Sequence, residues 1–219
     1  MLYERLVHIY NTTNCRKYYP VSSVDNLYRF IQQSLDQRKK NVSPYGFANF
    51  SGFSVENSIQ FFMYFSNRDG IFDIIYFFEC SKPTCGNRVY LSTDDLNSGD
   101  NMISCDECDK EYIVEDIQEF IKAYYAIRKE FLLGVPRIAV TDTGRKDPNS
   151  TFQVIKGLTD DLKWDSPSSL SNHLRGDDEG ECTDPVTLDQ IVKGNIDNSG
   201  EAISDAVQTF LDKMYQRYE

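Results

Sequence analysis

Four of the six cysteines form two close pairs, and thiolates are strong ligands for transition metals. Cys80 and Cys85 are separated by four residues, and Cys105 and Cys108 by two. Structural zinc sites use pairs of this kind, because a tight turn lets two thiolates reach one tetrahedral ion. Nineteen residues lie between the two pairs, which suits a site built from two turns. We therefore predict a structural Zn²⁺ site whose four sulfur ligands leave no coordination position open for chemistry.

The turn that contains the first pair carries a resemblance to a known module. Its sequence Pro83-Thr84-Cys85-Gly86 resembles the Pro-x-Cys-Gly turn of zinc ribbons, and Gly86 stands where such a turn needs a positive φ. The second pair is followed by Asp109-Lys110 instead of glycine, so this turn departs from the ribbon pattern. The resemblance implies a zinc-ribbon module over residues 80–112, and we identify no family for the whole chain.

Other uses of the four thiols stay open at this point. An iron–sulfur cluster also takes four thiolates, and Cys105 and Cys108 have the spacing of a redox pair. Two disulfides would need an oxidising compartment, yet the first residues lack an apolar run of signal-peptide length. No apolar run approaches the ~20 residues that span a bilayer. We therefore expect a soluble, cytoplasmic (intracellular) protein with no membrane association.

The charge is acidic and unevenly distributed. The chain of 219 residues has a formal net charge of −11. Residues 1–141 carry 18 acids and 15 bases, whereas residues 142–219 carry 16 acids and 8 bases. An acidic segment is repelled by a nucleic-acid backbone, so the charge disfavours nucleic acid as a partner. We expect an α+β domain over 1–141 that contains the ribbon, with 142–219 as an acidic, partly helical region packed on it.

Apolar spacing predicts the elements around the cysteines. Two β-rich runs, 59–65 and 71–79, flank an Asp-Gly turn and predict a central antiparallel hairpin whose second strand leads into Cys80. Residues 41–55 indicate a loop. Positions spaced as on one helix face predict helices near 2–10, from a cap at Ser23 or Asp25 through Gln37, and at 116–133. Shorter strands are expected at 88–91, 102–104, 112–114, 137–141 and 151–155.

The C-terminal region contains weaker signals. Asp184-Pro185 fits a helix N-cap followed by proline, and residues 165–184 have the composition of a mobile surface segment. A last helix from about Glu201 has one strongly apolar face, which must bury itself on this chain or on a partner. We favour packing on the same chain.

Three patterns with possible chemistry are incomplete. Asp142-Thr143-Gly144 resembles the catalytic loop of aspartic proteases, but no second copy supplies the partner carboxylate, and a turn explains it equally well. Asn195, Asp197, Ser199 and Gly200 resemble the first half of a calcium loop, whose anchoring Glu is replaced by Ala206. We expect an Asn/Asp-rich turn there. The histidines and the cysteines outside the two pairs show no nucleophile-like context: His8, His173, Cys15 and Cys182.

The sequence favours a non-enzymatic role. We expect an adaptor or subunit of a multi-protein complex, in which the ribbon holds a recognition hairpin rigid and Arg88, Tyr90 and Lys110 contact a protein partner. The alternative is a nucleic-acid-binding or regulatory zinc-ribbon protein, in transcription or in defence against foreign DNA. Its contact face would combine six basic residues: Arg16, Lys17, Arg38, Lys39, Lys40 and Arg88. A hydrolase acting through Asp142 is the third class.

Overall fold

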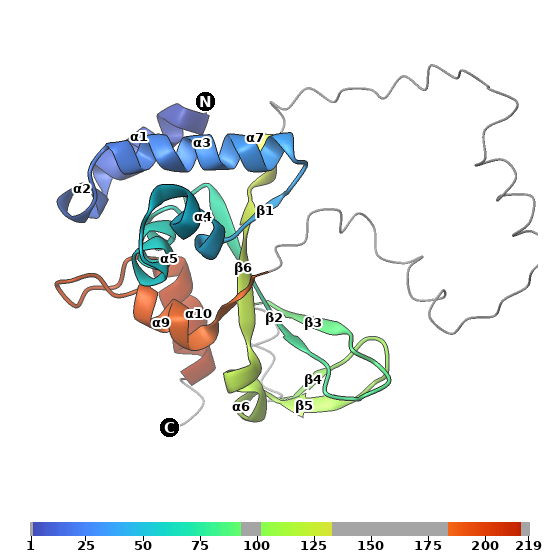
Figure 1. The fold of residues 1–219 in the computed structure, drawn as a ribbon. Helices are drawn as coiled ribbons and strands as arrows, with labels where there is room; N and C mark the ends of the chain where they lie inside the picture. The colour runs from blue at the N-terminus through green and yellow to red at the C-terminus, as the bar shows by residue number, and fades with distance from the viewer. Residues whose placement is uncertain (1, 93–101, 133–183, 216–219) are drawn as a thin grey trace, which may run out of the picture. The chain divides into compact units, whose positions relative to one another are not determined.

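The computed structural model describes residues 2–92, 102–132 and 184–215. They belong to one compact unit that mixes helices with an antiparallel sheet, so the predicted α+β fold class is confirmed (Figure 1). Several predicted features lie outside the described residues. These are the strands at 137–141 and 151–155, the segment 165–183, Asp142-Thr143-Gly144, His173 and Cys182.

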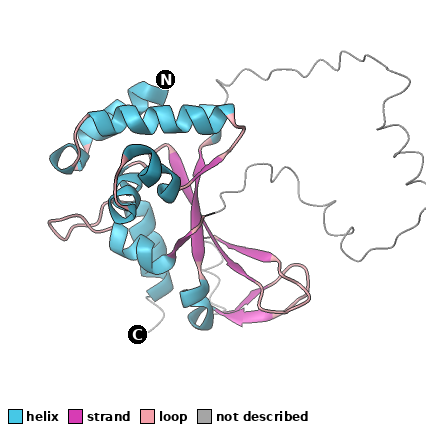
Figure 2. Cartoon of the chain, viewed as in Figure 1, coloured by secondary structure: helices cyan, strands magenta, loops and turns pink. Residues whose placement is uncertain are grey.

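The sheet is built around two long strands, β2 (Phe72–Glu79) and β6 (Lys122–Ile127). They pair antiparallel from Phe72 opposite Ile127 to Phe77 opposite Lys122. On the outer side of β2 lies β3 (Arg88–Leu91), and β6 pairs in addition with β1 (Asn41–Val42) and β7 (Val186–Thr187), as the strands in Figure 2 show. Segments far apart in the chain therefore meet on one sheet.

Helices cover one side of β6 in Figure 1. The side chains between these helices and the sheet are mostly aromatic, and Phe47, Phe61, Phe62, Phe72 and Tyr125 are all fully buried. Phe62 stacks on Phe72 with ring centres 4.9 Å apart, which joins helix to strand. The helices are α1 (Leu2–Thr12), α2 (Cys15–Tyr18), α3 (Ser22–Asp36), α4 (Pro44–Ser51), α5 (Val55–Tyr64), α9 (Leu188–Gly194) and α10 (Asp205–Tyr215).

The prediction of a strand at 59–65, the first of the hairpin, is wrong, because residues 55–64 form helix α5. The Ser54 side chain caps this helix by accepting from the Asn57 N–H at 3.1 Å. Six of its ten residues are buried, so the helix is apolar on nearly all sides and lacks a single stripe. Close approach of α9 adds to the burial, since a Cβ on Gly194 would lie 2.5 Å from the Ile59 side chain. The Asp-Gly turn joins a helix to a strand.

The predicted helix over 116–133 is also wrong. The chain there forms a short helix α6 (Val114–Ile117), a 3₁₀ turn η2 (Gln118–Phe120), strand β6 and helix α7 (Lys129–Leu132). In β6 every second residue is buried, at Ala123, Tyr125 and Ile127. This is the two-residue period of a strand, and β6 adopts it because it pairs with other strands on both edges.

The predicted loop over 41–55 contains β1 and helix α4. Ser43 caps α4 and Pro44 occupies its first turn. Ser followed by Pro is a helix start signal, but the Asn, Ser and Gly content of the segment suggested a loop. The predicted cap at Asp184-Pro185 is wrong as well. Thr187 caps α9 through a capping box with Gln190.

Other predicted elements are confirmed. Helices α1 and α3 and strands β2 and β3 match, as do β4 (Met102–Ser104) and β5 (Glu111–Ile113) within a residue. The last helix starts at Asp205, four residues later than expected. It packs on the same chain: Phe210 stacks face to face on Tyr76 with ring centres 3.6 Å apart.

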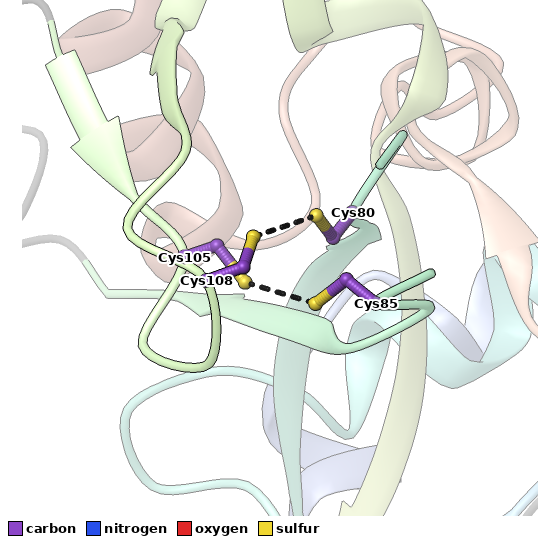
Figure 3. Close-up of side chains that lie close together, drawn as sticks. All are labelled: Cys80, Cys85, Cys105 and Cys108. Carbon is purple, nitrogen blue, oxygen red and sulfur yellow. Dashed lines mark hydrogen bonds between the residues drawn. The ribbon is translucent and has the colours of Figure 1, made fainter. Parts of the chain in front are cut away.

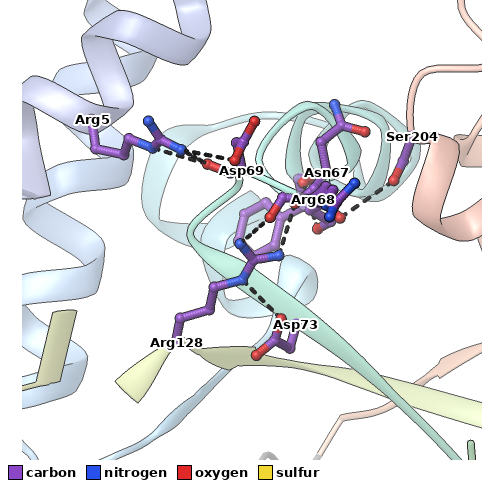
Figure 4. Close-up of polar contacts among 9 residues, drawn as sticks. Arg5, Asn67, Arg68, Asp69, Asp73, Arg128 and Ser204 are labelled. Atoms are coloured by element: carbon purple, nitrogen blue, oxygen red, sulfur yellow. Dashed lines mark hydrogen bonds and ion pairs between the residues drawn. The ribbon is translucent and has the colours of Figure 1, made fainter. Parts of the chain in front are cut away.

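The turn between α5 and β2 connects several distant segments (Figure 4). Arg128, just after β6, donates to the carbonyl oxygens of Asn67 at 2.8 Å and Arg68 at 2.6 Å. The same guanidinium pairs with Asp73 at 2.8 Å. Arg5 of α1 donates to the carbonyl oxygen of Asp69. These bonds connect the turn to α1 and to the end of β6.

A second set of bonds ties this turn to the start of α10. The Asn67 side chain donates to the Ile203 carbonyl at 3.3 Å and accepts from the Asp205 N–H at 3.2 Å. Ser204, fully buried, donates to the carbonyl of Ser66. The C-terminal helix is therefore positioned by the same short turn that starts β2.

We expect Gly70→Ala to destabilise the fold strongly. A Cβ at this position would lie 2.2 Å from the Phe65 carbonyl oxygen, which accepts from both Ile71 and Phe72. Relieving that clash must break these bonds, at a cost of about 3 kcal/mol. Urea unfolding measures the change. Gly52→Ala is the control, because Gly52 has φ 79° and open space around it, so only backbone strain of about 1 kcal/mol is expected. Equal losses for both variants would contradict the steric argument.

Candidate metal centre

The four paired cysteines converge at one point (Figure 3). All four Sγ atoms lie within 4.8 Å of one another, and none forms a disulfide. Two contacts join the pairs to each other, with Cys80 Sγ to Cys108 Sγ and Cys85 Sγ to Cys105 Sγ both at 3.6 Å. Tetrahedral zinc with Zn–S bonds of about 2.3 Å sets its sulfurs about 3.8 Å apart. The cluster therefore has the ligand number and spacing to hold one metal ion.

Four strand ends deliver these side chains. Cys80 directly follows β2, and β3 begins three residues after Cys85. Cys105 directly follows β4, and β5 begins three residues after Cys108. Strands β2 and β3 belong to the main sheet, whereas β4 and β5 form a separate two-stranded sheet. A metal ion here would join the two sheets.

Each turn uses a left-handed residue just after its second cysteine. Gly86 has φ 61°, which confirms the positive φ expected there. Asp109 has φ 54° at the matching place in the second turn. Asp is among the side chains that tolerate this conformation, so the missing glycine does not prevent the turn. Backbone bonds from the N–H groups of Cys108 and Asp109 to the Cys105 carbonyl close it.

Two side chains outside the cysteine set bond to the sulfurs. The Tyr112 hydroxyl lies 2.9 Å from Cys80 Sγ and accepts the backbone N–H of Ser81 at 2.9 Å; when Cys80 is a thiolate, the hydroxyl is the donor to the sulfur. Asn87 donates from Nδ2 to Cys105 Sγ at 3.7 Å, and its buried Oδ1 has no partner in the described part of the chain. Donors of this kind orient metal ligands and stabilise thiolate charge. Sequence reasoning missed both.

The electrostatics of the cluster favour a cation. Burial opposes ionisation of Cys80, but the hydrogen bond from Tyr112 and further donors around it lower the pKa of this thiol to about 6. The Asn87 backbone N–H lowers the pKa of Cys85, yet burial and the neighbouring thiols outweigh it and raise the pKa to about 12. One sulfur thus ionises readily while another resists. Four thiolates this close would repel one another, so ionisation of all four cysteines requires a bound cation.

The three predicted partner contacts differ in their surroundings. Tyr90 is 43% exposed on β3. Arg88 lies on the same face of that strand, with its guanidinium 5.2 Å from the ring centre of Phe77. Lys110 donates to Ser81 Oγ at 2.8 Å, and its Nζ lies 5.2 Å from the ring centre of Tyr112. Lys110 is therefore bonded beside the cysteine cluster although its side chain is exposed, Tyr90 is exposed as well, and Arg88 is half-buried.

The basic residues of the nucleic-acid hypothesis lie in three places. Arg16 and Lys17 are on α2, which precedes α3, and the run 38–40 follows the other end of α3. The fifteen residues of α3 span about 22 Å. Arg88 lies on β3, away from both ends of that helix (Figure 1). These residues do not form one contiguous face.

The loop that resembles a calcium site is held by its own bonds. Asp197 Oδ1 accepts from the backbone N–H groups of Ser199 and Glu201 and from the Ser199 hydroxyl. The Ser199 hydroxyl bond is the main reason that the pKa of Asp197 lies below its usual value. Asn195 is buried and accepts from the Ser204 N–H at 2.8 Å. The segment is the Asn/Asp-rich turn that the sequence predicts.

The remaining cysteine and histidine of the described chain are separate from the centre. Cys15 is completely buried, and burial raises the pKa of its thiol strongly, so it is unreactive. His8 is exposed on α1.

Comparison of the chain with protein-family models, with curated proteins and with solved structures finds no match. Within the part of the chain that the structure describes, no helix combines the length and apolar composition that a bilayer crossing requires.

We expect Tyr112→Phe to weaken metal binding while the fold persists. The variant keeps the ring that packs edge-on against Phe78, but it removes the donor to Cys80 and the acceptor for the Ser81 N–H. Loss of such a partner typically reduces metal affinity by about 10–100-fold. Competition with a chromogenic chelator measures the affinity. Tyr90→Phe, which removes an exposed hydroxyl on β3, should leave it unchanged, and an unaltered affinity in Tyr112→Phe would exclude the proposed contact.

Proposed function

We propose that the cluster holds one structural zinc ion and that the chain acts as a non-catalytic interaction subunit. The observation that carries this proposal is the all-sulfur set: four thiolates fill every position of a tetrahedral ion and leave none for substrate or water. The strand arrangement around the four cysteines supports a zinc ribbon over residues 80–112. Four thiolates also suit iron, so metal analysis must distinguish the two.

The segment around the four cysteines, residues 80–113, is called the metal module below. Exposed apolar side chains on it support a role in protein binding. Met102 and Ile113 are directly opposite each other on β4 and β5, and they are 48% and 44% exposed. Tyr90 on β3 is similarly open. A two-stranded sheet buries too little to be stable alone, and a metal ion would keep this small apolar surface rigid. Rigid apolar groups on a polar surface favour contact with another protein.

The nucleic-acid alternative has weaker support, because its basic residues are dispersed and the chain has a net charge of −11. Measuring binding to random DNA and RNA at low salt separates the two hypotheses. Affinity that falls steeply as salt rises would favour the alternative over the interaction subunit.

The first prediction from this proposal concerns the metal. Protein purified without chelators should contain one zinc per chain, and Cys85→Ser or Cys105→Ser should abolish the stoichiometric metal. Removal of zinc should unfold β4 and β5, while helices α1, α3 and α5, which pack away from the cluster, persist in the circular dichroism spectrum. Cys15→Ala is the matched control and should retain the metal. A brown protein containing iron would contradict the assignment to zinc.

The second prediction concerns the interaction. If the outer face of β4 and β5 binds a protein, Met102→Ser together with Ile113→Ser should abolish co-purification of that partner from the source cells and leave the zinc content unchanged. Val21→Ser is the control, because Val21 is 56% exposed but lies directly before α3 and not on β4 or β5. A tagged protein that stays monomeric and partnerless in those cells would rule out an interaction subunit.

A further inference from the structure

A groove lies beside the metal module, between two segments that are remote in the sequence. One wall is formed by α6 and η2, and the other by the end of β7 and the first turns of α9. Its volume is about 690 Å³, and Tyr215 of α10 lines it as well. The Leu188 N–H donates to the Ile121 carbonyl at 3.0 Å, and this bond fixes the two walls against each other. The groove is therefore preformed.

The groove combines apolar and acidic lining residues. Leu188 is buried, Val192 is half-buried and the Tyr215 ring is 45% exposed. Val192 and Tyr215 provide apolar surface where a partner side chain can insert beside the buried Leu188. Phe120, 57% exposed, follows the acidic wall directly and extends the apolar surface beyond the groove.

The charge of the lining has one sign. Four carboxylates line the groove, on Glu115, Asp116, Glu119 and Asp189, and no Lys or Arg is among the lining residues. Asp189 pairs with Lys193 at 2.7 Å. Asp116 and Glu119 are exposed, form no ion pair with any described residue, and are spaced three residues apart, as on one side of a helical turn. The charge here is available to a partner.

The surroundings reinforce this field. Residues 102–119 contain seven acids and one base, and that base is Lys110, which is held against Ser81 and Tyr112. A basic ligand approaching this side is attracted, and an acidic one is repelled. Charge complementarity thus selects a cationic occupant, and the apolar lining selects one with apolar side chains.

We propose that this groove binds a basic amphipathic segment of a partner protein. Apolar side chains of the segment pack against Leu188, Val192 and Tyr215, while its Lys or Arg side chains pair with Asp116 and Glu119. The inference rests on the proposed function as an interaction subunit and adds the chemistry of one partner. A helical segment of about twelve residues is about 18 Å long, enough to present one apolar face and flanking charges.

The test uses the full-length, metal-loaded protein and a fluorescent peptide of about twelve residues, with Leu at helical spacing and Lys at the other positions. We expect fluorescence anisotropy to show binding that weakens as salt rises, and no binding of a matched peptide with Glu in place of Lys. Asp116→Lys combined with Glu119→Lys should weaken binding at least about ten-fold. Val192→Thr, nearly isosteric, should weaken it several-fold.

The matched control is Asp36→Lys combined with Glu130→Lys, which changes net charge equally at exposed sites outside the groove. An equal loss in this control would show that only bulk charge attracts the peptide, and it would overturn the proposal. So would self-association of the protein that Asp116→Lys and Glu119→Lys abolish, because the occupant would then be a second copy.

The same variants separate this inference from the proposed function. If Met102→Ser with Ile113→Ser abolishes partner capture while the groove variants bind peptide and partner normally, the groove assignment fails and the interaction subunit stands. If zinc is absent and no partner is captured, the proposed function fails, and peptide binding then reports on the groove alone.

Discussion

Pairing of β2 with β6 is the constraint on which the rest of the structure depends. At its start, β2 leaves the turn that binds Arg128 and the beginning of α10. In its middle, Tyr76 stacks on Phe210, which places the C-terminal helix on the sheet. At its end, Cys80 enters the sulfur cluster. Because one strand performs all three tasks, the aromatic core and the metal module share a single register, and a shift of that register would move every side chain to the opposite face.

Sequence periodicity located most elements but predicted a strand where helix α5 forms and a helix where strand β6 forms. The run Ile59–Phe65 is rich in β-formers, yet it forms part of a helix enclosed by α4 and α9, where an all-round apolar surface conceals the 3.6-residue period. In 116–133, the apolar spacing predicts a helix, but strand β6 forms there because β1, β2 and β7 satisfy its backbone. The burial of α5 and the pairing of β6 on both edges are tertiary properties, so the local pattern could not decide either case.

The metal centre was more predictable than the core, because ligand spacing is a local property. Two short cysteine pairs limit the chain to tight turns, and Gly86 marks one of them directly. The bonds from Tyr112 and Asn87 were not predictable in the same way, since they depend on how the two sheets face each other. A signal was nevertheless present: both residues lie within four positions of a ligand cysteine, where the returning strand passes the sulfurs.

The position of Lys110 is consistent with attraction of its ammonium group by the negative charge of a four-thiolate centre. If the cluster holds Zn²⁺, as we propose, four thiolates give the centre a net charge of −2, and residues 102–119 beside it are acidic. The Lys110 ammonium bonds to Ser81, the neighbour of Cys80, and lies against the ring whose hydroxyl bonds to that sulfur. Its charge is therefore better placed to balance the thiolates than to meet a partner. Under the proposed interaction role, the surface of residues 102–119 offers exposed apolar and acidic side chains, so a partner that binds there would carry the positive charge.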